Sequence, residues 1–180
     1  MSFIRYVVLL RGINVGGKMV KMETLRNLLH SMKFQNIKTL LNSGNVIFDS
    51  HENDISLLSH RLEKAFEKEF RFHIDVLIRT MDDIVSLVTS EPFKDVSLTS
   101  ETRLYITFIS SEKKPTIQIP YESNEKDLRI LAVDNRYVLT VITLSTNKNT
   151  TDMMKLLEKE FGKKITTRNW NTVQKISALS

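Results

Sequence analysis

Tyr6-Val7-Val8-Leu9-Leu10-Arg11-Gly12-Ile13-Asn14-Val15-Gly16-Gly17-Lys18 is the stretch of sequence that decides the fold. Its first five residues are apolar without interruption, which predicts a short strand buried on both faces of a sheet. The strand runs directly into a loop that contains three glycines and is flanked by Arg11 and Lys18. Glycine lets a backbone turn sharply or lets a ligand approach it closely. This loop is therefore the first candidate for a functional site.

The composition excludes several classes of protein. A chain of 180 residues is long enough for one domain or two small ones with a real hydrophobic core. It has no cysteine, which excludes a disulfide framework and a thiolate metal site. Residues 1–5 lack the pattern of a secretory signal, and no apolar run approaches the ~20 residues that span a bilayer. We therefore expect a cytoplasmic protein without a membrane partner.

Positive charge is concentrated at the two ends of the chain. The whole chain has 26 Lys and Arg against 21 Asp and Glu, a mild excess of +5. Residues 1–22 and 161–180 contain no acidic residue, whereas acids and bases alternate elsewhere. If the two ends meet in space, they form one positive region.

The first half of the chain has the pattern βαββαβ. Apolar periodicity predicts strands over 6–10, 37–41, 46–48 and 73–79, and helices over 22–32 and 55–70. Asn42-Ser43-Gly44-Asn45 has the composition of a hairpin turn, and Asn53 or Asp54 can cap the second helix. This order is typical of ferredoxin-like folds.

A third helix and a polar segment follow the first half. Thr80-Met81-Asp82-Asp83 resembles a capping box and predicts a helix that ends near Pro92. Residues 94–102 are polar and rich in turn-forming residues. We therefore place a boundary here, between a first subdomain over 1–92 and a second over 93–180.

The second half repeats the plan with one irregular element. Strands are predicted over 103–109, 128–133, 137–142 and 165–167, with a helix over 151–161 and a last helix that carries Trp170. The segment 113–127 lacks a helical period, so the first helix is short or irregular there. Asp134-Asn135 reads as a two-residue hairpin turn, because both residues tolerate positive φ.

A repeated tetrapeptide supports an internal duplication. Glu67-Lys68-Glu69-Phe70 and Glu158-Lys159-Glu160-Phe161 close the corresponding helices of the two halves. We predict an α+β protein of two ferredoxin-like (α–β plait) subdomains with a C-terminal helix.

The glycine loop matches most of the phosphate-binding pattern, in which backbone N–H groups surround an anion and a lysine reaches its outer oxygens. Met19, however, stands where that pattern has the Ser or Thr that holds Mg²⁺. We therefore do not expect nucleotide hydrolysis. The simpler interpretation is a tight loop whose glycines serve geometry alone.

The favoured hypothesis is recognition of a small anionic or phosphorylated ligand at this loop, by a binding module or an enzyme of unknown class. Gly16 and Gly17 would allow backbone approach, and Lys18 and Arg11 would supply charge. Asn14 and Asn45 would orient the ligand. The full set of candidate ligand-binding residues is Arg11, Gly12, Asn14, Gly16, Gly17, Lys18, Asn45 and Arg168.

Two other functions remain as alternatives. Nucleic acid could bind a basic surface, but the central strands offer only Tyr6 and Phe48 as stacking aromatics, and we expect both rings in the core. A structural or oligomerising protein without a ligand is the other alternative. The four histidines share no metal-ligand spacing, and no nucleophile arrangement is evident, so we predict neither a metal nor a cofactor.

Three motifs together resemble a known family. LLRGINVGG at 9–17, NSGNVIF at 42–48 and TTRNWNTVQKI at 166–176 are similar to a bacterial family known as domain of unknown function 1697. The resemblance implies two ferredoxin-like subdomains, and it implies no established activity, cofactor or catalytic residue. Its signature falls on Arg11, Gly12, Asn14, Gly16, Gly17, Ser43, Gly44, Asn45, Arg168, Asn169 and Trp170.

Overall fold

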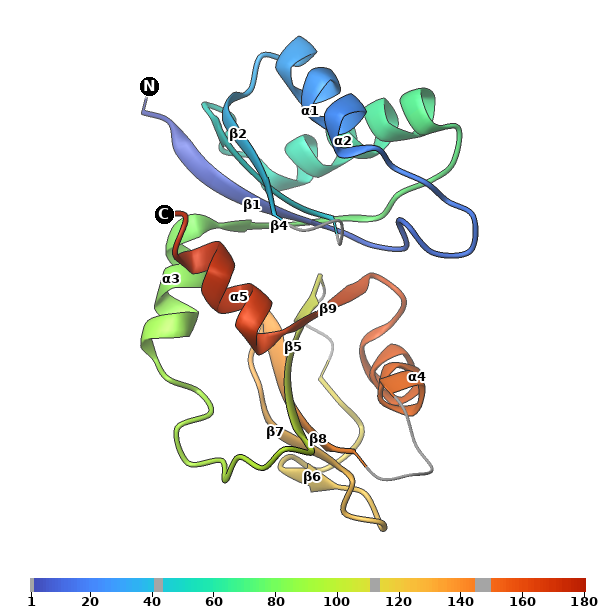
Figure 1. The fold of residues 1–180 in the computed structure, drawn as a ribbon, viewed down its shortest axis with the longest axis vertical. Helices are drawn as coiled ribbons and strands as arrows, with labels where there is room; N and C mark the ends of the chain where they lie inside the picture. The colour runs from blue at the N-terminus through green and yellow to red at the C-terminus, as the bar shows by residue number, and fades with distance from the viewer. Residues whose placement is uncertain (1, 41–43, 111–113, 145–149) are drawn as a thin grey trace. The chain divides into compact units, whose positions relative to one another are not determined.

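The computed structural model describes residues 2–40, 44–110, 114–144 and 150–180. Over these residues the protein has a mixed α+β fold with two antiparallel sheets and five helices (Figure 1). The chain divides into two compact units, Met1–Ser86 with Ile176–Ser180, and Leu87–Lys175.

The first unit has the predicted order of elements. These are β1 (Ile4–Leu10), α1 (Met22–Ser31), β2 (Gln35–Leu40), β3 (Asn45–Ser50), α2 (Ile55–Phe70), β4 (Val76–Thr80) and the start of α3 (Met81–Thr89). The strands form a sheet in the order β2-β3-β1-β4, and all neighbours are antiparallel. Helices α1 and α2 lie together on one face of this sheet (Figure 1).

Strand β1 is the centre of the first unit. It pairs along its length with β3 and β4, so Val7 lies between Ile47 and Arg79. Tyr6, Val8 and Leu10 belong to the core cluster that includes side chains of both helices. Val7 and Leu9 point to the opposite face and are fully buried as well. The prediction of a strand buried on both faces is confirmed.

Two helix starts follow their predicted capping chemistry. The Asp54 carboxylate accepts a hydrogen bond from the N–H of Leu57 at 3.0 Å at the start of α2. At α3, the N–H of Asp83 donates to the Thr80 hydroxyl at 3.1 Å, while the N–H of Thr80 donates to the Asp83 carboxylate at 3.3 Å. This exchange is a capping box, with Asp in the position that Glu usually takes.

The connection between β2 and β3 requires glycine at position 44. Gly44 has φ +75°, and a Cβ atom there would lie 2.9 Å from both the Leu10 Cβ and the Ile13 Cδ1. The predicted turn residues Asn42 and Ser43 lie outside the described residues. Gly44 therefore combines a left-handed backbone with close packing against the end of β1.

The second unit repeats the strand order with an added edge strand. Its elements are β5 (Thr102–Ile109), β6 (Tyr121–Glu122), β7 (Leu128–Val133), β8 (Tyr137–Thr143), α4 (Thr150–Phe161), β9 (Ile165–Asn169) and most of α5 (Trp170–Ser177). The sheet order is β6-β7-β8-β5-β9. Strands β7, β8, β5 and β9 thus follow the order of β2, β3, β1 and β4.

The described part of the segment between β5 and β7 contains the short strand β6 and no helix, as the missing period predicted. A buried carboxylate holds this segment: Glu160 of α4, only 2% exposed, accepts from the N–H of Thr116 at 2.6 Å and from its hydroxyl at 2.8 Å. The Thr116 hydroxyl is the main reason that the pKa of Glu160 lies below its ordinary value.

The turn between β7 and β8 differs from the prediction. The hairpin exists, but neither Asp134 nor Asn135 has positive φ. The N–H of Asp134 donates to the Tyr137 carbonyl at 2.9 Å, and the Asp134 carboxylate accepts from the N–H of Arg136 at 2.9 Å. Asn135 and Arg136 are therefore the central residues, and an Asx-type hydrogen bond shapes the turn.

At the start of the last helix, the Asn169 side-chain oxygen accepts a hydrogen bond from the N–H of Asn171 at 3.0 Å. Val173 and Ile176 are fully buried. Trp170 is only half-buried and meets Phe93 edge to face, with ring centroids 5.3 Å apart. Because the Trp170 ring is partly exposed, its removal should lower the free energy of unfolding less than removal of a fully buried ring would.

The contrast between two glycines tests the packing at the end of β1. We expect Gly44→Ala to lower the free energy of unfolding by roughly 2–5 kcal/mol, because backbone strain adds to overpacking. Gly17→Ala, where φ is +82° but nothing lies within 4 Å of the new Cβ, should cost only about 1–2 kcal/mol. Urea denaturation measures both, and equal losses would contradict the packing role of Gly44.

The repeated tetrapeptide offers a matched pair of glutamates. Glu160→Gln should lower the free energy of unfolding by roughly 1–3 kcal/mol, because a charged acceptor with two bonds is lost. The corresponding Glu69 is exposed, so Glu69→Gln should have no measurable effect. Because the pKa of Glu160 is depressed, its contribution is present above the ordinary value of 4.5 and disappears as the pH falls below it. If the difference in the free energy of unfolding between Glu160→Gln and the unmodified chain stayed the same above and below pH 4.5, the role of the carboxylate would be refuted.

Candidate functional site

The glycine loop forms a miniature hairpin. Val15 and Lys18 make an isolated antiparallel bridge, in which the N–H of Lys18 donates to the Val15 carbonyl at 3.1 Å. Gly16 and Gly17 lie between them with φ of +57° and +82°. Positive φ at both central residues is the arrangement of a type I′ turn, which explains why both are glycine. Residues 11–20 are called the glycine hairpin below.

Asn14 and two apolar residues hold the base of the hairpin. The N–H of Asn14 donates to the Lys18 carbonyl at 2.6 Å, and its side-chain oxygen accepts from the N–H of Val20 at 2.9 Å. Asn14 itself has φ +56°. Ile13 and Val20 are buried in the core of the first unit, so they fix the hairpin to the protein while its tip stays in solvent.

The hairpin differs in geometry from a phosphate-binding loop. Such a loop surrounds its anion with N–H groups at the start of the following helix, but α1 begins only at Met22. Met19, in the metal-ligand position of the pattern, is 72% exposed. Within the described residues the N–H groups of Gly16 and Gly17 donate no hydrogen bond, and a Cβ atom added at either position would have nothing within 4 Å.

The hairpin packs against the segment between α2 and β4. The N–H of Arg11 donates to the Asp75 carbonyl at 3.1 Å. The Lys18 ammonium lies 5.6 Å from the centre of the Phe72 ring, which is within the range of a cation–π contact. The two basic residues of the loop therefore lie beside residues 72–75.

The remaining predicted ligand residues are placed away from the hairpin tip. Gly12 is exposed at the base of the hairpin, with φ +70°. Asn45 is completely buried and its side-chain amide donates to the Leu40 carbonyl at 3.1 Å, so it supports the β2–β3 connection. Arg168 belongs to β9 of the second unit. The structure therefore groups Arg11 to Lys18 and assigns Asn45 a structural position.

Arg168 is a buried cation. It is 8% exposed, and its Nη1 donates to the Thr166 hydroxyl at 2.8 Å and to the Thr167 carbonyl at 2.9 Å. Burial lowers the pKa of Arg168 to about 10, because desolvation disfavours the charged form. These contacts hold the guanidinium against its own strand.

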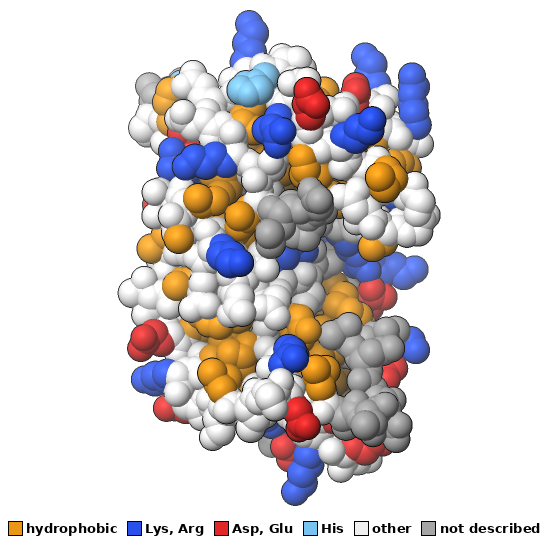
Figure 2. Space-filling model, viewed as in Figure 1, with side chains coloured by type: hydrophobic (Ala, Val, Ile, Leu, Met, Phe, Trp, Pro, Cys, Tyr) orange, Lys and Arg blue, Asp and Glu red, His pale blue; other side chains and the backbone are white. Residues whose placement is uncertain are grey.

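A basic stretch of sequence is not always basic in space. Arg5, in the acid-free N-terminal stretch, forms a two-point ion pair with Asp49 at 2.9 and 3.2 Å. Hydrogen bonding from the Arg5 side chain is the main reason that the pKa of Asp49 lies below its ordinary value. On the face drawn in Figure 2, Lys and Arg side chains are interspersed with acidic and apolar ones.

Both candidate stacking aromatics lie in the core. Tyr6 and Phe48 are 1% and 0% exposed and contribute to the cluster under the helices of the first unit. The Tyr6 hydroxyl donates to the Glu52 carbonyl at 2.8 Å. They are therefore unavailable for stacking on bases, as expected.

One cluster of metal-ligating side chains escaped the sequence analysis. Glu63 of α2, His73 and Asp75 place ligand atoms within 4.8 Å of one another. The sequence analysis predicted a strand over 73–79, and in a strand His73 and Asp75 would point to the same side, which is a readable signal. Glu63 comes from the preceding helix, so only the fold adds it to the pair.

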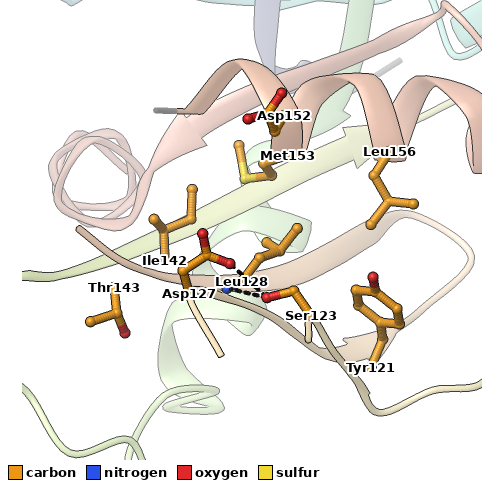
Figure 3. Close-up of a pocket in the computed structure, with 9 residues that line it drawn as sticks. All are labelled: Tyr121, Ser123, Asp127, Leu128, Ile142, Thr143, Asp152, Met153 and Leu156. Carbon is orange, nitrogen blue, oxygen red and sulfur yellow. Dashed lines mark hydrogen bonds between the residues drawn. The ribbon is translucent and has the colours of Figure 1, made fainter. Parts of the chain in front are cut away.

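A second feature that the sequence analysis missed is a pocket of about 200 Å³ in the second unit (Figure 3). Leu128, Ile142, Met153 and Leu156 form its apolar lining, and polar groups come from Tyr121, Ser123, Asp127, Thr143 and Asp152. The Ser123 hydroxyl donates to the Asp127 carboxylate at 2.6 Å. Two carboxylates beside an apolar lining suit a small ligand that carries hydrogen-bond donors.

No helix in the described part of the chain has the length and apolarity needed to cross a membrane.

The comparison with solved structures bears on the fold. The conserved bacterial protein SP0830 from Streptococcus pneumoniae superposes with a TM-score of 0.74. It is 24% identical, and the match covers 99% of this chain and 98% of that protein. No curated protein matches this chain.

A family model matches this chain from residue 3 to residue 139. The matching model is described as protein of unknown function (DUF1697). This range contains the glycine hairpin and Gly44–Asn45, and it ends before Arg168. The chain belongs to the DUF1697 family of proteins of unknown function.

Proposed function

We propose that the protein binds a small anionic or phosphorylated ligand at the glycine hairpin. The observation that carries the proposal is the exposed tip, where Gly16 and Gly17 leave their N–H groups accessible and the next residue, Lys18, is exposed as well. Successive backbone N–H groups in a turn bind anions well. A cation next to them adds charge-assisted hydrogen bonds.

Five residues of the hairpin have a role in this proposal. Gly16 and Gly17 donate backbone hydrogen bonds, and Lys18 supplies the mobile charge. Arg11 adds a second charge at the base, and Asn14 keeps the hairpin in shape through its bond to Val20. Asn45 contributes only by supporting the neighbouring connection.

Binding of inorganic phosphate, pyrophosphate and nucleotides tests this proposal. A ligand at 100 times its Kd should stabilise the protein by about 2.7 kcal/mol in a thermal shift. Lys18→Ala should weaken binding about tenfold or more, because a hydrogen bond to a charged group is lost. Lys94→Ala removes an exposed lysine of the second unit and serves as the matched control. Equal affinity in both variants would refute the site.

The same measurements separate the nucleic-acid alternative. An oligonucleotide bound to a basic surface should lose affinity steeply as salt increases, because counterions are released. Its binding should be insensitive to Lys18→Ala. That combination of results would favour nucleic acid over a small ligand.

Magnesium should be dispensable. Met19 cannot ligate a hard cation, so we expect a phosphate ligand to bind equally well with and without Mg²⁺ and ATP turnover to stay at background. Isothermal titration with and without EDTA measures the first, and phosphate release measures the second. Mg²⁺-dependent hydrolysis that Lys18→Ala abolishes would contradict this expectation.

We also propose that the two halves derive from one ferredoxin-like (βαββαβ) unit, joined near residues 92 and 93. The shared strand order and the repeated tetrapeptide support this origin. In the second copy, β6 and its neighbouring segment take the place of the first helix. A bacterial, cytoplasmic setting is part of the proposal, and the source of the structural relative supports the first of these terms.

A further inference from the structure

Glu63, His73 and Asp75 converge from helix α2 and from the segment that precedes β4. Glu63 lies on α2, whereas His73 and Asp75 precede β4 in the chain. Their ligand atoms all lie within 4.8 Å of one another. Ligands about 2.0–2.2 Å from a zinc ion lie up to ~4 Å apart, so small side-chain rotations would close this set on a cation.

Hydrogen bonds from outside the cluster hold two of the three residues. The Glu63 carboxylate accepts from the N–H of Val76 at 3.2 Å, which keeps it directed toward the start of β4. The Asp75 carbonyl accepts from the N–H of Arg11 at 3.1 Å, which fixes the backbone on which its carboxylate stands. Such outer contacts orient metal ligands and reduce the cost of assembling a site.

The His73 ring already faces a carboxylate. Its Nε2 atom lies 3.2 Å from Asp75 Oδ1, and the two side chains are 53% and 37% exposed. A divalent cation between them would replace this single contact with two coordinate bonds. Because both side chains reach solvent, water or another ligand could complete the coordination sphere.

We propose that Glu63, His73 and Asp75 bind a divalent transition-metal ion. One imidazole and two carboxylates suit Zn²⁺, Mn²⁺, Fe²⁺, Co²⁺ or Ni²⁺, whereas Mg²⁺ and Ca²⁺ prefer oxygen ligands throughout. The proposal rests on this ligand set alone. It stands whether or not the glycine hairpin binds an anion.

Titration of the chelator-treated full chain with Zn²⁺ and with Co²⁺ tests the site. We expect Zn²⁺ to bind with one ion per chain and to raise the melting temperature, and Co²⁺ to give visible absorption bands of a protein-bound ion. His73→Gln and Asp75→Asn should each weaken binding about tenfold or more, since loss of a direct ligand costs at least as much as loss of an outer one. The same concentration of Mg²⁺ should have no effect.

His30→Gln is the matched control, because His30 is an exposed histidine in the last turn of α1. It should bind Zn²⁺ as the unmodified chain does. Circular dichroism verifies that every variant is folded; His73 and Asp75 reach solvent, so we expect them to be dispensable for folding. Failure of the unmodified chain to bind Zn²⁺ below millimolar concentration would overturn the proposal. Equal affinity in His73→Gln and His30→Gln would do so as well.

Discussion

Double-sided burial of β1 is the constraint on which the first unit depends. From Tyr6 to Leu10 the strand is apolar at every position, so side chains on both of its faces must be kept away from water, while its peptide groups need partners on both edges. The pairing with β3 and β4 meets the second demand, and the burial of Val8 and Val7 on opposite faces meets the first. Each such side chain contributes about 1.5–3 kcal/mol. The glycine hairpin inherits its position from this strand, because the N–H of Leu10 bonds to the Gly44 carbonyl at 2.8 Å and the next N–H bonds to Asp75.

Features governed by neighbouring residues were predictable from the sequence. The caps at Asp54 and Thr80 depend on hydrogen bonds between residues three positions apart, so the local sequence is enough to predict them. The turn at Asp134 was predicted in place but not in mechanism, because its carboxylate and not its φ angle makes the bend. Glu69 and Glu160 show the limit most clearly. They occupy the same position of a repeated tetrapeptide, yet only Glu160 is buried. Its hydrogen-bond partner Thr116 comes from a segment without a helical period, so the sequence pattern does not reveal the contact.

The candidate site shows the same division. Consecutive glycines before a lysine fit both a phosphate loop and a two-residue hairpin, since both conformations need positive φ. The distinction lies in where the next helix begins, and Met22 is too far along the chain for its N-terminus to belong to the loop. Asn45 was predicted to orient the ligand, but the fold buries it completely. Glu63 could not be assigned from the sequence, because its relation to His73 and Asp75 exists only after α2 packs beside β4.

The acid-free N-terminal stretch does not carry unpaired positive charge at every basic residue. Arg5 belongs to an acid-free segment of the sequence, but it forms an ion pair with Asp49 through two hydrogen bonds. Next to the glycine hairpin, acidic side chains lie beside a basic stretch of sequence. The backbone N–H of Arg11 donates to the Asp75 carbonyl, and the Asp75 carboxylate belongs to the cluster with Glu63. The two carboxylates lie on the side of the hairpin base, where Arg11 contacts Asp75, and their negative charge opposes the approach of an anion from that side. A divalent cation held by that cluster would cancel both charges. Since the contact between Arg11 and Asp75 joins the two proposed sites, we expect a cation bound by the cluster to strengthen anion binding at the hairpin.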